Sequence, residues 1–160
     1  QRCFMITSKK TPPSEGIKNS PCVGICSTVY GDEVCKGCKR HFDEIITWNQ
    51  WGDDKKQQVY TRLETLMQEA MAPLLSIVQP EALEAELVLQ GIPYLHFKSA
   101  YLWLFLLWVK KPESLTSWEH IGIRLHDQYK SMKPTDLLNQ IDDTVNAQAQ
   151  ILYDTSETIC

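Results

Sequence analysis

Hydrophobic residues recur at helical spacing through most of the chain. Val59, Leu63, Leu66 and Ala70 lie four, three and four residues apart, and charged residues occupy mostly the other face. This pattern predicts an amphipathic helix that ends at Pro73. Similar stripes, several of them bounded by prolines or glycines, predict further helices along the chain. The predicted helices span residues 43–50, 54–71, 80–90, 100–109, 114–132 and 135–153.

The most apolar stretch is residues 100–109, A-Y-L-W-L-F-L-L-W-V. Ten helical residues reach only about 15 Å, roughly half of a bilayer core. Lysines also close the stretch on both sides, so we expect no membrane span. We predict a central helix that is buried on nearly all sides. The alternative is an interfacial helix or a partner groove, because Trp103 and Trp108 suit boundaries between apolar surroundings and water.

The helix predicted over residues 114–132 has Gly122 as a weak point. Its inward stripe would consist of Trp118, Ile121, Leu125, Tyr129 and Met132. His120 and His126 lie six residues apart and would point in different directions, so they form no helical metal pair. Neither histidine has a recognisable catalytic partner in the sequence. We expect no strand outside the cysteine-rich segment, where a small hairpin fits.

Four of the six cysteines lie within seventeen residues near the start of the chain. Their spacing is C-x3-C, eight residues, then C-x2-C. Short loops of this kind bring sulfurs together around one ion if the backbone turns tightly, and Gly24 and Gly37 permit such turns. The predicted metal ligands are Cys22, Cys26, Cys35 and Cys38.

The identity of the metal stays open between zinc and an iron–sulfur cluster. A closed shell of four thiolates is typical of structural zinc, which we favour. The C-x3-C pair and the short loop between the pairs depart from the usual zinc spacing and keep a cluster as the alternative. A further alternative to a metal site is that the cysteines form disulfides or stay unligated thiols. His41 is expected beside the site rather than as a ligand.

The cysteine segment resembles a small bacterial family. The resemblance rests on S-P-C-V-G-I-C at residues 20–26, V-C-K-G-C-K-R at 34–40 and D-E-I-x-x-W at 43–48. It is similar to the domain-of-unknown-function family 1289, commonly labelled a predicted iron–sulfur protein, and covers about residues 20–66. The resemblance implies a bacterial cytoplasmic protein with a four-cysteine centre and brings no established activity. The roughly hundred residues that follow depart from that family.

Charge is unevenly distributed along the chain. The net charge is -4, but residues 1–42 carry seven basic and three acidic groups, a balance of +4. A basic N-terminal segment followed by an acidic remainder suggests that the N-terminal segment binds a negatively charged partner. The alternative is that the cations neutralise their own thiolate site. The predicted partner-binding residues are Lys36, Lys39, Arg40 and His41.

These patterns predict a mainly α protein, with an N-terminal four-cysteine metal module packed on a four- or five-helix bundle. We expect an extended arm over residues 1–19, the module over 20–52 and a helical domain over 53–160. Adjacent carboxylates diverge on a helix, and four thiolates leave no open metal position, so we expect no enzyme. The predicted function is a cytoplasmic, metal-stabilised accessory protein that docks on a protein or an RNA-containing assembly. The alternative is an iron–sulfur electron-transfer or redox-sensing protein.

Overall fold

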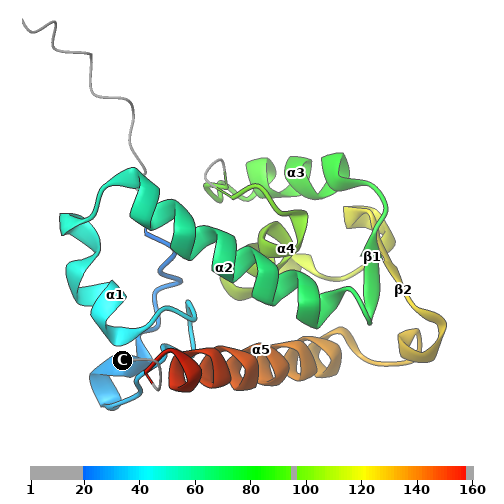
Figure 1. The fold of residues 1–160 in the computed structure, drawn as a ribbon. Coiled ribbons are helices and arrows are strands. Elements are labelled where there is room, and N and C mark those ends of the chain that lie inside the picture. Colours follow the sequence, from blue (N-terminus) through cyan, green and yellow to red (C-terminus); the bar gives the residue numbers. More distant parts are fainter. Residues whose placement is uncertain (1–19, 95–96, 158–160) are drawn as a thin grey trace, which may run out of the picture.

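The computed structural model describes residues 20–94 and 97–157. It is mainly helical, as predicted, and carries a small two-stranded sheet (Figure 1). The arm predicted over residues 1–19 lies outside the described residues. The α-helices are α1 (Phe42–Thr47), α2 (Asp53–Met71), α3 (Pro80–Leu89), α4 (Ala100–Lys110) and α5 (Pro134–Glu157). The strands are β1 (Leu75–Ile77) and β2 (Ile123–Leu125), and 3₁₀ turns occupy Ser27–Tyr30, Trp48–Gln50, Pro112–Ser114, Glu119–Ile121 and Asp127–Tyr129.

Helix α2 is the centre of the packing, because it contacts both α4 and α5, while α3 packs on α4 (Figure 1). The predicted stripe of Val59, Leu63, Leu66 and Ala70 is buried, and Tyr60 and Met67, each at most 1% exposed, widen it. Val34 and Trp48, from the cysteine-rich segment, belong to the same hydrophobic core. The cysteine segment therefore shares one continuous core with the helices.

Helix α4 is the central apolar helix that the sequence predicts. Its buried residues are Leu102, Leu104, Phe105, Leu106 and Leu107. The two tryptophans are half-buried, and the indole Nε1 of Trp103 donates to the carbonyl oxygen of Phe97 at 2.9 Å. Within the described residues, no helix combines the length and apolar character that crossing a bilayer would require.

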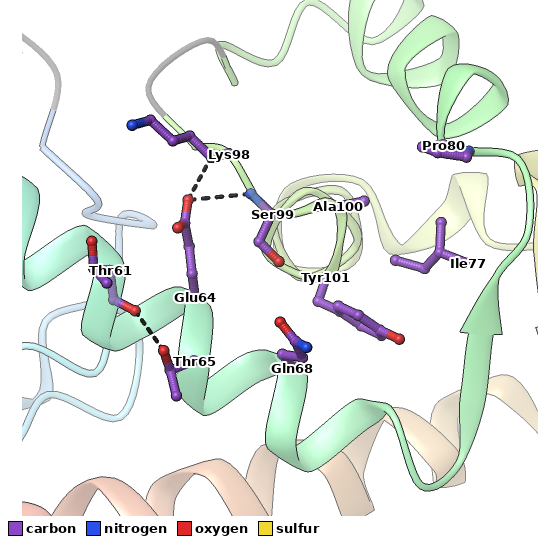
Figure 2. Close-up of a pocket in the computed structure, with 10 residues that line it drawn as sticks. All are labelled: Thr61, Glu64, Thr65, Gln68, Ile77, Pro80, Lys98, Ser99, Ala100 and Tyr101. Carbon is purple, nitrogen blue, oxygen red and sulfur yellow. Dashed lines mark hydrogen bonds between the residues drawn. The ribbon is translucent and has the colours of Figure 1, made fainter.

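A carboxylate from α2 satisfies the start of α4. Glu64 Oε1 accepts from the backbone N–H groups of Lys98 at 2.5 Å and Ser99 at 3.2 Å (Figure 2). Both residues lie just before the first residue of α4, where backbone N–H groups have no partner within the helix. The positive end of the helix also favours a negative charge at this position. An open pocket of about 440 Å³ adjoins this contact. The place that an anion would take beside these N–H groups is already occupied by the carboxylate of Glu64.

The helix predicted over residues 114–132 does not form. This stretch holds two 3₁₀ turns, Glu119–Ile121 and Asp127–Tyr129, and strand β2, which pairs antiparallel with β1 in the register Leu75 with Leu125. The expectation of no strand outside the cysteine-rich segment was therefore also wrong. Gly122 explains the break: its φ is +75°, and a side chain there would clash with the carbonyl oxygen of Gln79. Ile121 and Leu125 are nevertheless buried, as predicted. The inward residues were correct although the secondary structure was not.

His126 has a partner that the sequence did not indicate. Its Nε2 lies 3.0 Å from Ser76 Oγ, and its Nδ1 lies 2.8 Å from the carbonyl oxygen of Pro73. A serine and histidine in this relation resemble a nucleophile and its base. However, neither side chain lines the cavities that flank the β1–β2 ribbon. The contact ties the chain after β2 to the start of β1.

An ion pair holds α1 against α2. Arg62 Nη1 and Nη2 donate to the two carboxylate oxygens of Glu44 at 2.5 and 2.6 Å, and the backbone N–H of His41 donates to Glu44 Oε2 at 2.9 Å. The Glu44 side chain is only 11% exposed. Burial raises the pKa of this carboxyl, but the Arg62 and His41 contacts outweigh it, so the pKa lies below its usual value.

We expect Arg62→Gln to lower the free energy of unfolding by about 3 kcal/mol at neutral pH, since it leaves the Glu44 carboxylate buried without its cation. Because the pKa of Glu44 is depressed in the folded protein, the stability from this pair is present above the unfolded pKa. It is lost as pH falls through the lower folded pKa. The deficit of the variant should therefore shrink in acid.

Urea denaturation at neutral and acidic pH measures this difference. Lys111→Gln is the matched control, because the ion pair of Lys111 with Glu113 is long, at 3.8 Å, and exposed. An Arg62→Gln deficit that is equally small at both pH values would contradict the assignment.

Candidate metal centre

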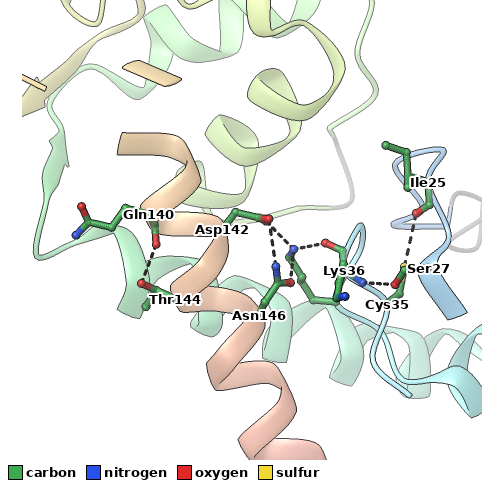
Figure 3. A network of polar contacts seen from close by, with 9 residues as sticks. Ile25, Ser27, Cys35, Lys36, Gln140, Asp142, Thr144 and Asn146 are labelled. Carbon is green, nitrogen blue, oxygen red and sulfur yellow. Dashed lines mark hydrogen bonds and ion pairs between the residues drawn. The ribbon is translucent and has the colours of Figure 1, made fainter. Parts of the chain in front are cut away.

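The two cysteine loops touch each other through a glycine. A side chain at Gly37 would clash with the carbonyl oxygen of Ile25 and press on the side chain of Val23. Gly24 takes a φ of +96°, which favours glycine. The backbone N–H of Lys36 donates to Ser27 Oγ at 2.8 Å and links the loops again (Figure 3). The C-x3-C and C-x2-C loops therefore lie against one another.

Cys35 and Cys38 form a close, buried pair, 0% and 4% exposed. A hydrogen bond from the Cys38 thiol favours the Cys35 thiolate and, against the effect of burial, lowers the pKa of Cys35 to about 4. The same hydrogen bond and burial raise the pKa of Cys38. The hydrogen bond between the two side chains thus moves the pKa values of the two thiols in opposite directions.

The first cysteine pair lies in the neighbouring loop. Cys22 is exposed and its Sγ accepts from the backbone N–H of Gly24 at 3.4 Å, whereas Cys26 is half-buried with its Sγ 3.0 Å from Thr28 Oγ1. Among residues 20–94 and 97–157, no group of three His, Cys, Asp or Glu side chains is placed to share an ion. The structure brings together one of the two pairs, and the four-sulfur site stays a prediction.

Two of the predicted partner-binding cations, Arg40 and Lys39, face the interior. Arg40 is 3% exposed; its Nε donates to Cys38 Sγ at 3.3 Å, and its guanidinium lies over the Trp48 ring. Lys39 is fully buried. The guanidinium beside Cys38 fits the alternative reading, in which cations neutralise the thiolates of their own site.

Lys36 and His41 are the accessible members of the predicted set. The side chain of Lys36 is 69% exposed and pairs with Asp32 at 3.4 Å. His41 precedes α1, where its Nδ1 lies 3.6 Å from Glu44 Oε1 and its ring meets Tyr153 edge-on. The exposed positive charge of the described module is therefore small.

Lys39 joins the cysteine module to helix α5. Its Nζ donates to Asp142 Oδ1 at 2.6 Å, to Asn146 Oδ1 at 2.7 Å and to the carbonyl oxygen of Lys36. Burial lowers the pKa of Lys39, and the carboxylate of Asp142 opposes that effect. Figure 3 shows Asp142 and Asn146 side by side on α5, facing the loop that carries Lys36. Sequence reasoning missed both partners; their signal is polar residues four apart beside the apolar stripe of α5.

Exposed apolar side chains gather on the cysteine module. Among the described residues, ten large hydrophobic side chains are exposed, and half of them lie between residues 25 and 46. Phe42 and Ile46 are 45% and 58% exposed, whereas Trp48 of the same segment is buried. We call this set the module face: Ile25, Val29, Tyr30, Phe42 and Ile46.

The fold and the site together define a mainly helical protein with a four-cysteine segment at its front. Residues 20–67 match the family described as "Protein of unknown function (DUF1289)", which confirms the resemblance and its limits. The "Uncharacterized protein YdhL" of Escherichia coli K12 and that of Shigella flexneri are each 48% identical over 42 residues, 25% of this chain. The chain spans about half (49%) of the length of these curated relatives. No solved structure matches.

We expect Lys39→Met to lower the free energy of unfolding by about 3 kcal/mol, because it leaves the carboxylate of Asp142 without its cation in a partly buried position. Lys36→Met is the matched control: it removes an exposed, salt-bridged lysine three residues away and should cost less than about 1 kcal/mol. Urea denaturation monitored by far-UV circular dichroism checks both. Equal effects of the two variants would contradict a structural role for the buried lysine.

Proposed function

We propose that this protein is a non-catalytic binding protein whose cysteine module is stabilised by one metal centre. Cys22, Cys26, Cys35 and Cys38 would hold the metal, with zinc favoured. A module of some thirty residues buries too little apolar surface to fold alone, so ligation would supply much of its folding energy. The contact of the two loops at Gly37, the buried Cys35–Cys38 pair and the N–H groups directed at sulfur support this assignment.

The module face is the observation that carries the binding role. Tyr30 is 90% exposed and Val29 is 73% exposed, on a short turn between the two cysteine pairs. Aromatic and aliphatic side chains held on a rigid turn are typical of protein interfaces, where they act as anchors. We propose a protein partner that contributes a complementary apolar surface.

RNA is the weaker candidate on the described residues, because two of the three Lys and Arg side chains of the cysteine module are internal. Lys39 and Arg40 are buried, and Lys36 is paired with Asp32. Phosphate contacts by such cations supply a large share of the affinity for nucleic acids. We therefore propose a protein partner, and an RNA-containing assembly stays the alternative.

A second candidate function is iron–sulfur electron transfer or redox sensing. The buried Arg40 guanidinium donates to Cys38 Sγ, and hydrogen bonds to sulfur are one of the means by which proteins set cluster potentials. In either case four thiolates leave no open coordination position, which favours a structural or electron-transfer centre over hydrolytic catalysis.

We expect protein purified without oxygen to be colourless and to contain about one zinc ion per chain. Cys35→Ala and Cys22→Ala should each greatly reduce the metal content, because the first removes a buried sulfur and the second tests the exposed one. Elemental analysis with visible absorption spectroscopy measures this. Brown protein that contains iron and sulfide would instead support the second candidate. Metal content unchanged by Cys22→Ala would remove the first pair from the site.

We expect Val29→Ser/Tyr30→Ser to abolish capture of the protein partner without lowering the melting temperature, because both side chains are exposed. Val88→Ser/Leu89→Ser is the matched control, since it removes two apolar side chains on α3 that are 63% and 76% exposed. Affinity capture with mass spectrometry compares the three baits.

A supporting partner is retained after nuclease treatment, retained by the α3 variant and lost only with the module-face variant. Loss of the captured partners after nuclease treatment would instead support docking on an RNA-containing assembly. Partners shared equally by all three baits would refute the role of the module face.

A further inference from the structure

A second site lies in the part of the chain beyond the family match. A cavity of about 540 Å³ opens between the segment that joins β1 to α3, the turn before β2, and β2 itself. Its volume is in the range of small-molecule sites. The residues that line it are Val78, Gln79, Trp118, Glu119, Gly122, Ile123, Arg124, Leu125 and Lys130. All of them follow residue 67, so the relatives' matched segment does not contain this cavity.

The backbone of the cavity wall is fixed. Val78 N–H and Gln79 N–H both donate to the carbonyl oxygen of Gly122, at 2.9 and 3.1 Å. Gly122 also packs so closely on Gln79 that no side chain fits there. Backbone donors on this side are therefore used within the protein, and a ligand must be recognised by side chains.

The charged side chains of the lining favour an anion. Arg124 is exposed and makes no recorded ion pair with any residue of the described ranges. Lys130 pairs only with the exposed Asp127, at 2.5 Å. Glu119, the one carboxylate in the lining, accepts from the hydroxyl of Ser117 at 3.3 Å. Because Asp127 already pairs with Lys130, Arg124 is the lining cation that is left without a carboxylate among the described residues.

The aromatic ring of Trp118 also lines the cavity. The indole Nε1 of Trp118 has no hydrogen-bond partner among the described residues, but it has almost no exposed surface. A ligand in the cavity would therefore meet the ring of Trp118 and not this donor.

We propose that this cavity binds a small organic molecule that carries a carboxylate or phosphate group. The guanidinium of Arg124 offers the paired donors that such oxyanions accept, and Lys130 adds a second positive charge. The ring of Trp118 provides an aromatic wall. The site is independent of the cysteine module and of the binding role proposed for it.

Phenyl phosphate and benzoate, each paired with its neutral counterpart (phenol and benzyl alcohol), test this proposal. We expect saturable binding of at least one anion by isothermal titration calorimetry and no comparable binding of the neutral compounds. The indole N–H signal of Trp118, assigned with Trp118→Phe, should shift in the NMR spectrum. The stronger of the two anions distinguishes phosphate from carboxylate recognition.

Arg124→Gln should weaken anion binding at least about tenfold, the loss expected for one charged hydrogen bond. Lys111→Gln, an exposed cation outside the cavity, should leave it unchanged. Thermal melts verify that both variants fold. The proposal is overturned if neither anion binds at millimolar concentration, if the neutral compounds bind equally well, or if Arg124→Gln binds like the unaltered protein.

Discussion

The buried ammonium group of Lys39 is the interaction on which the front of this molecule depends. A charge of this kind cannot stay in the interior without compensation. Asp142 and Asn146 supply that compensation from α5, more than a hundred residues away in the sequence. The module that contains Lys39 is therefore positioned by the far end of the chain. Arg40, the next residue, faces Cys38 and Trp48 instead. Two adjacent cations thus attach the cysteine loops to α5 and to the core.

Helices with long, regular stripes could be predicted from the sequence because their periodicity and their terminating residues agree. Helix α2 begins with Asp53 and Asp54 at its positive end, and α3 begins at Pro80, both as expected. Residues 114–132 failed because their apolar positions also fit a helix, and only the contact of Gly122 with Gln79 decides otherwise. That contact joins distant segments, and its local sign in the sequence is Gly122 itself, the weak point of the predicted helix. Strands of three residues are likewise too short to show an alternation.

The contact between the two cysteine loops could be predicted from their spacing, but the electrostatics of this segment could not. Clustered lysine and arginine residues usually form a solvated surface, and composition alone does not distinguish that case from burial. The structure does so by placing Asp142 opposite Lys39 and Cys38 beside Arg40. The opposite case is found on α1, where Phe42 and Ile46 lie at helical spacing yet are exposed. Both cases concern which face of a short segment meets the core, and tertiary packing decides that.

A run of aromatic rings connects the cysteine module with the helices. Trp48 meets Tyr60 edge-on at 5.7 Å, and Tyr60 meets Phe97 in the same way at 5.0 Å. Tyr60 has no exposed surface, so neither neighbour can move away without opening the core. The consequence is cooperativity: the module and α2 should lose their structure together, as a single folding unit. The indole of Trp48 would then serve as an intrinsic fluorescent reporter of that shared transition.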